Sequence, residues 1–155
     1  RGVLGRVTGV RGAALLPSIV DAMGPIEPTR IDTGWDAALA QAASFTTRPS
    51  LVVLLTALDV AGASRGLLGA LPALTRRTRV VVGSVTDADL PRLAATRTTS
   101  DEVWLAASVE RTLLDAARLS AAIGRLGADA LSAGPEDLPP RIADRYLELK
   151  AAGRL

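Results

Sequence analysis

The chain has 155 residues, of which 48% are hydrophobic and 22% charged, a balance that excludes a disordered polymer and indicates one domain with a packed core. It contains neither Cys nor His, which excludes disulfides, thiol nucleophiles, imidazole metal ligands and Ser-His-Asp catalysis. Its 18 basic and 16 acidic residues leave a net charge of +2, too small to favour an acidic partner.

Two kinds of partner are not expected from the sequence. The only tight basic group, Arg76, Arg77 and Arg79, lies far along the chain from the few aromatic residues, so we expect no nucleic-acid binding. The most apolar stretch, 51–63, contains Asp59 and falls short of the roughly 20 residues of a spanning helix, so we expect no membrane contact by this segment. Because the chain begins with Arg, we expect it to be part of a longer protein.

The first third of the chain alternates between the two kinds of regular structure. We expect a strand within Val3 to Val10 and then a helix from Leu15 to Met23, which Gly24-Pro25 ends. A second helix is expected from about Asp36 to Phe45. The continuous apolar run from Leu51 to Leu55 indicates a strand that is covered on both faces.

The middle of the chain reads as a strand-helix-strand unit. A helical stripe is followed by a second buried strand within Arg79 to Val85, which favours a parallel crossover between this strand and the first. The stripe consists of Leu67, Leu68, Leu71 and Leu74. Pro72 lies within it and is expected to kink or restart the helix.

The last third is expected to add two strands and two helices. We expect a short strand from Glu102 to Ala106, and the longest helix from about Val109 to Leu126 with Gly127 at its C-terminal cap. An edge strand over Ala128 to Ser132 is expected to follow. A final helix is expected from about 139 to 153, with Leu138, Ile142, Tyr146 and Leu149 on its inner side. This alternation predicts an α/β fold, a three-layer, doubly wound and mostly parallel sheet.

Hydroxyl and carboxylate side chains follow the predicted strands, where ligands of open α/β sheets bind. Such groups are hard oxygen ligands that suit Mg²⁺ or Ca²⁺. They are Thr56 and Asp59 after the first core strand, Ser84, Thr86 and Asp87 after the second, and Thr33 and Asp36 before a helix. A simpler interpretation is helix capping, because Thr33 to Asp36 and Thr86 to Asp89 both match a capping box. We expect Trp35 and Trp104 to be packing residues rather than stacking platforms.

Three blocks of the sequence carry a family resemblance. They are RPSLVVLLTALD at 48–59, LPALTRR leading into RVVV at 71–82, and ADRYLELKAAGRL at 143–155. In these blocks the chain resembles the bacterial "domain of unknown function 58" family, in its Ala- and Arg-rich actinobacterial branch. That family is similar to von Willebrand factor type A domains. The resemblance implies that 1–155 is a single partial domain of this type, its C-terminal portion, without the first strand.

The resemblance also implies a degenerate metal site. Domains of this type hold a metal ion with an Asp-x-Ser-x-Ser segment on the first strand, a Thr before a later helix, and an Asp after the fourth strand. Thr33 matches the Thr, whereas the first segment is absent from the chain. Thr56 ends the corresponding strand and Asp59 is the nearest carboxylate. We therefore expect no tightly bound cofactor in this chain, although the full-length parent could hold Mg²⁺.

Function follows from the resemblance as an expectation. It implies a non-enzymatic protein-interaction or adaptor domain, working with a MoxR-type AAA ATPase in the assembly or remodelling of a partner complex. It also implies a cytoplasmic domain whose parent is anchored in the inner membrane by upstream helices. We expect the partner at the carboxyl rim, on Thr33, Trp35, Asp36 and Asp59, with Trp35 either the anchor or buried over the sheet.

Two alternatives remain open at this point. The chain could be a Mg²⁺-dependent enzyme using Thr33, Thr56, Asp59 and Asp87 at the rim. It could also be a structural fragment whose activity needs the missing upstream half. In the fold that the resemblance implies, the Leu51 to Leu55 strand lies next to the missing first strand and has one unpaired edge, which residues 3–10, a second copy of the chain, or a covering helix or loop would have to fill.

Overall fold

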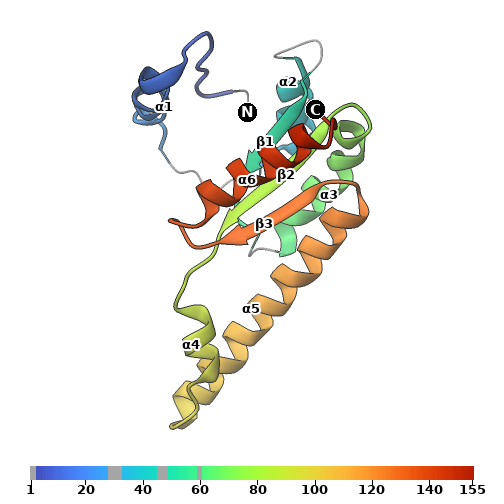
Figure 1. Ribbon diagram of the computed structural model, residues 1–155. Helices are drawn as coiled ribbons and strands as arrows, with labels where there is room; N and C mark the ends of the chain where they lie inside the picture. Colours follow the sequence, from blue (N-terminus) through green and yellow to red (C-terminus); the bar gives the residue numbers. More distant parts are fainter. Residues whose placement is uncertain (1–2, 28–32, 45–48, 59–60) are drawn as a thin grey trace.

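The computed structural model describes residues 3–27, 33–44, 49–58 and 61–155. This part of the chain is a mixed α/β protein (Figure 1). Its elements in order are α1 (Leu15–Met23) after a short 3₁₀ turn (Gly12–Ala14), α2 (Trp35–Ser44), β1 (Leu51–Leu55), α3 (Ala61–Thr75), β2 (Arg79–Val85), α4 (Leu90–Ala95), α5 (Ser100–Arg125), β3 (Asp129–Ala133) and α6 (Leu138–Ala151).

The three strands form a parallel sheet in the order β1-β2-β3. Leu51 pairs with Arg79 at one end of β1 and Leu55 with Gly83 at the other, while Val81 of β2 pairs with Asp129. The central strand is covered on both faces, because all of its residues except the first and last are buried. The predicted strands at Leu51 to Leu55 and Arg79 to Val85 are therefore confirmed, and so is the edge strand that follows the longest helix.

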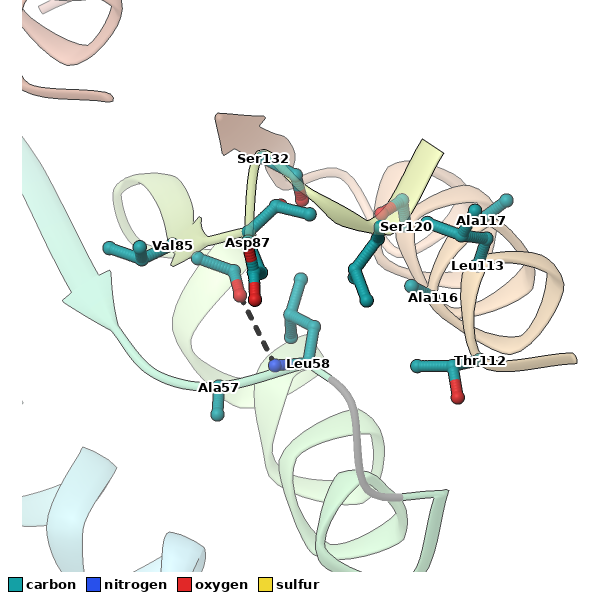
Figure 2. Close-up of a pocket in the computed structure, with 13 residues that line it drawn as sticks. Ala57, Leu58, Val85, Asp87, Thr112, Leu113, Ala116, Ala117, Ser120 and Ser132 are labelled. Carbon is teal, nitrogen blue, oxygen red and sulfur yellow. Dashed lines mark hydrogen bonds between the residues drawn. The ribbon is translucent and has the colours of Figure 1, made fainter. Parts of the chain in front are cut away.

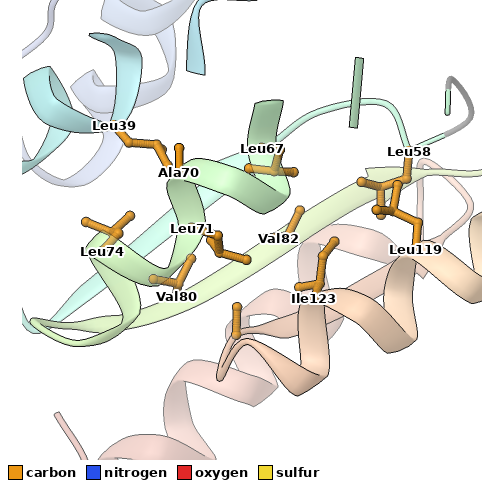
Figure 3. Close-up of a cluster of buried hydrophobic side chains, with 11 residues drawn as sticks. Leu39, Leu58, Leu67, Ala70, Leu71, Leu74, Val80, Val82, Leu119 and Ile123 are labelled. Atoms are coloured by element: carbon orange, nitrogen blue, oxygen red, sulfur yellow. The ribbon is translucent and has the colours of Figure 1, made fainter. Parts of the chain in front are cut away.

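Helices cover both faces of the sheet and make three layers. On one face α3 and α5 pack against Val80 and Val82, and α2 packs against α3 (Figure 3). The core of this layer is fully buried, with Leu71 and Ile123 both 0% exposed. On the other face α6 contacts β2 and β3. Helix α1 lies to one side of the sheet in Figure 1, and its Leu16, Val20 and Met23 are exposed.

Two predicted strands are wrong. Residues 3–10 form no strand, and 102–106 belong to α5, which begins at Ser100 rather than near Val109. The earlier start has a local cause, because Thr99 and Glu102 form a capping box that satisfies the first amides of the helix. The helix is therefore 26 residues, about 39 Å long, and extends beyond the sheet.

The structure tests two other local predictions, one at Pro72 and one at Gly127. Helix α3 runs through Pro72 as one element and does not restart, because Leu67, Leu71 and Leu74 on both sides of the proline are held in the core. Gly127 caps α5 as predicted, with φ +84°. The amide of Gly127 donates to the Gly124 carbonyl at 3.0 Å and that of Ala128 to the Ile123 carbonyl at 3.3 Å, the two bonds of a Schellman motif.

Candidate functional site

The carboxyl ends of the three parallel strands meet at one rim of the sheet, and a cleft lies there against α5. Its volume is about 560 Å³ (Figure 2). The rim side is formed by residues after β1, at the end of β2 and in β3, and the opposite wall by α5 and Leu90 of α4. The lining residues are Ala57, Leu58, Ser84, Val85, Thr86, Asp87, Leu90, Thr112, Leu113, Ala116, Ala117, Ser120 and Ser132.

Ser84 connects two of the elements that form the cleft. It is the one polar residue among the described ones whose exposure falls to a buried level, 6%. Its Oγ accepts a hydrogen bond from the Leu58 N–H at 3.2 Å, shown as the dashed line in Figure 2. Because Leu58 is itself buried, this bond holds the segment after β1 against the end of β2.

Thr86 and Asp87 lie in the cleft, but not as helix caps. The Thr86 N–H donates to the Ala133 carbonyl at 2.8 Å, which extends the β2–β3 ladder by one residue. Asp87 Oδ1 accepts the Asp89 N–H at 2.8 Å, and α4 begins only at Leu90. The predicted capping box at Thr86 is therefore wrong, because the two residues form a rim turn before the helix. Among the lining residues that the structure describes, Asp87 is the only one with a charged side chain.

The start of α2 and the residues just before it supply three of the predicted partner-binding residues. The Gly34 carbonyl accepts the Ala38 N–H at 3.0 Å, which places Gly34 at the N-cap and Thr33 one residue before it. Thr33 and Asp36 are exposed, whereas Trp35 is half-buried and packs against the core. The indole Cδ1 of Trp35 lies 3.0 Å from where a Cβ on Gly66 would be, so Gly66 lets the ring sit close to α3.

The structure describes two of the three predicted metal ligands, Thr33 and Thr56. Thr56 is half-buried, its N–H donates to the Gly83 carbonyl at 3.0 Å, and neither it nor Thr33 lines the cleft. Asp59 lies outside the described residues. Within the part of the chain that the structure describes, no three acidic side chains come together in a way that could hold a metal ion.

A helical arm formed by α4 and the first half of α5 projects beyond the rim (Figure 1). The capping box fixes its far end, because Glu102 Oε2 accepts the Thr98 and Thr99 amides, both at 2.8 Å, and Thr99 Oγ1 accepts the Glu102 N–H at 3.3 Å. The bonds from the Thr99 and Thr98 amides lower the pKa of Glu102 below its ordinary value. Arg97 and Glu110 form an ion pair beside this turn.

The arm carries the most exposed large hydrophobic residue described, Trp104, whose exposed fraction is 78%. Val103, Leu105 and Leu114 are each about half exposed on the same helix. This surface was not predicted from the sequence, because Trp104 was expected to lie in a strand and to pack against the rest of the fold. The Thr99-x-x-Glu102 pattern was the signal that could have placed the start of the helix before Trp104.

Charges on the middle of α5 are paired with one another along its exposed side. Asp115 accepts a bond from Arg111 Nε at 3.0 Å and another from Arg118 Nη1 at 3.1 Å. These bonds, that of Arg111 first, lower the pKa of Asp115. Asp115 is therefore ionised at neutral pH, and the two arginines balance its charge.

None of the described helices is both long and apolar enough to cross a membrane. The chain matches no protein-family model, and its comparison with curated proteins and with solved structures likewise gives no match.

Proposed function

We propose that the chain is a non-enzymatic protein-interaction domain whose partner contacts the arm of α4 and α5 next to the rim cleft. The observation that carries this proposal is Trp104, which is 78% exposed on a helix that projects from the sheet. Tryptophan is usually well buried in a folded chain, and it is the residue type most enriched at the centres of protein interfaces.

The surroundings of Trp104 favour a protein over a small molecule. Val103 and Leu114 lie on one flank of the helix and Leu105 on the other, so the apolar surface is convex and extends over more than two turns. Small molecules bind in concave sites, whereas a convex helical face fits a groove on another protein. Arg111 lies two turns from Trp104 on the same face of the helix. Arginine, like tryptophan, is enriched at protein interfaces.

The total accessible surface is larger than that of a compact monomer of the same mass. It amounts to 10708 Å² for a mass of 16.0 kDa. A compact monomer of this mass exposes about 7,400 Å². The projecting arm and the separate α1 contribute to the excess, and both carry exposed apolar side chains.

The more specific part of the proposal concerns the fold family and the partner. We propose a partial von Willebrand factor type A sheet of the "domain of unknown function 58" kind, with a MoxR-type AAA ATPase as the partner. Three features support it: the parallel order β1-β2-β3, the helices on both faces, and the open outer edge of β1, where the first strand of that fold would lie.

A binding measurement on matched aromatic variants tests the proposal. The purified chain is titrated with the MoxR-type ATPase of the same genome and binding is followed by sedimentation velocity. Trp104→Ala should weaken binding at least 30-fold, as expected for a hot spot. Tyr146→Ala, which removes a 40% exposed aromatic ring from α6 away from the arm, should leave the affinity unchanged.

Two results would overturn the proposal. One is equal binding by the Trp104→Ala and parent chains, which would remove the arm from the interface. The other is Mg²⁺-dependent turnover of a substrate by the purified chain that is lost in Asp87→Ala, which would favour the enzyme alternative at the rim.

A further inference from the structure

The outer edge of β1 presents backbone groups that no described strand satisfies. In a parallel strand the N–H and C=O of one residue point to the same side, and successive residues alternate. The Thr56 N–H donates to Gly83 of β2, so Val52 and Leu54 point to β2 as well. The N–H and C=O of Leu51, Val53 and Leu55 therefore point away from β2, where the described sheet has no further strand.

The side chains of these three residues lie on a partly bare face of the sheet. They are on the side of α6, because Leu55 and Ile142 of α6 both approach the Cβ position of Gly83. Helix α6 contacts β2 and β3, and Leu55 remains 70% exposed and Val53 38% exposed. Tyr146 follows Ile142 by one turn on the same side of α6 and is 40% exposed.

The other edge of the sheet is protected in a way that β1 is not. Strand β3 carries Asp129, whose carboxylate receives two bonds from Arg145 at 2.9 and 3.0 Å. A charged, ion-paired residue on an edge strand opposes pairing with another sheet. By contrast, all five residues of β1 are apolar, and no charged residue lies between Pro49 and Leu58.

We propose that the outer edge of β1 is a strand-acceptor site and that, in the chain of residues 1–155, its occupant is β1 of a second copy. A twofold axis normal to the sheet and midway between the Val53 residues of the two copies would pair the two strands antiparallel. Val53 would face Val53 of the other copy and Leu51 would face Leu55. All three outward N–H groups of each copy would then donate, which gives six hydrogen bonds and one six-stranded sheet.

The sequence of β1 fits pairing with itself. No like charges would face each other along the strand, because none are present. The bare-face side chains would form cross-strand neighbours, with Val53 beside Val53 and Leu51 beside Leu55, which stabilise paired strands. This proposal does not depend on the arm of α4 and α5, so its failure and that of the proposed function can be distinguished.

Proline variants on the two edges test the site. Val53→Pro removes an N–H that points outward and leaves the ladder with β2 intact. Ser132→Pro is the matched control, because the Thr86 N–H bond to the Ala133 carbonyl shows that Ser132 points outward from β3. In sedimentation velocity from 1 to 100 µM, the parent and Ser132→Pro should form a species of about 32 kDa, twice the 16.0 kDa chain. Val53→Pro should sediment as a monomer.

Val53→Lys provides a second route in case the proline variant does not fold, because two Lys side chains would face each other on the axis. Far-UV circular dichroism checks that each variant is folded, and the dimer dissociation constant of Val53→Lys should rise at least tenfold. A parent chain that is monomeric at 100 µM would overturn the proposal. This holds both if the Val53 and Leu55 amides exchange rapidly with solvent and if another segment of the chain protects them from exchange. A dimer that both Val53 variants retain would overturn it as well.

Discussion

Replacing Ser84 by Ala should destabilise the fold at the rim. The change removes the only acceptor shown for the Leu58 N–H, which lies 3.2 Å from Ser84 Oγ, while Leu58 is 4% exposed and Ser84 6%. A buried donor left without a partner costs about 1–3 kcal/mol. We therefore expect the free energy of unfolding to fall by about 2 kcal/mol and the melting temperature by roughly 4–8 °C for a chain of this size.

Urea unfolding followed by circular dichroism measures this change. The slope with denaturant should stay constant, because the variant exposes the same surface on unfolding. Ser132→Ala is the control, since Ser132 is exposed and its replacement should change stability by less than about 0.5 kcal/mol. If Ser84→Ala and Ser132→Ala unfold at the same urea concentration, the bond does not hold the segment after β1 in place.

Three further predictions concern the core, the arm and the sheet edge. Leu71→Ala, at a position that is 0% exposed, should lower the free energy of unfolding by about 2–5 kcal/mol in the same urea assay, and a loss below 1 kcal/mol would contradict the packing described. The pKa of Glu102 in the folded chain lies below its ordinary value of 4.5. The stabilisation that the ionised Glu102 carboxylate gives to the arm is therefore complete above pH 4.5, and it is lost as the pH falls through the lowered pKa. Amide exchange at Thr98 and Thr99 should accelerate in that acidic range, and an unchanged pH profile in Glu102→Gln would be inconsistent with this assignment. Arg145→Met should cost about 1 kcal/mol through its two-bond contact with Asp129, and a double-mutant cycle with Asp129→Asn that gives no coupling energy would refute the contact.

The sequence predicted the elements whose signals are local and strong. The apolar runs at Leu51 to Leu55 and within Arg79 to Val85 are strands, and the helix from Leu15 to Met23 has the predicted bounds. Gly127 ends α5 as predicted, because a positive φ at that position needs a glycine. In each case one physical requirement, burial on both faces or a special backbone angle, determines the residue types.

The errors occur where competing signals had to be weighed. Glu102 to Ala106 has the composition of a short strand, but the capping box at Thr99 starts a helix. This helix packs against α4, and its Ala106 and Val109 are buried. Residues 3–10 also have strand-like composition, but strand pairing is non-local and no local pattern shows whether a partner strand is within reach.

The rim was only partly predictable. Ser84, Thr86 and Asp87 were expected there and do line the cleft, because the ends of parallel strands meet at one edge. The opposite wall could not be anticipated, since Thr112, Ala116 and Ser120 reach the cleft only through the full length of α5. Packing was predicted for Trp104, and either packing or a partner contact for Trp35. In the structure Trp35 packs close to Gly66, whereas Trp104 is exposed.

The fluorescence of Trp104 during binding tests the central claim most directly. In the Trp35→Phe variant, Trp104 is the sole tryptophan, since the chain contains two. Its emission should be that of a solvated indole in the free chain and should shift to shorter wavelength as the MoxR-type ATPase, prepared without tryptophan, is added. Saturable binding by sedimentation with no change in this emission would contradict the claim that the arm of α4 and α5 is the interaction surface.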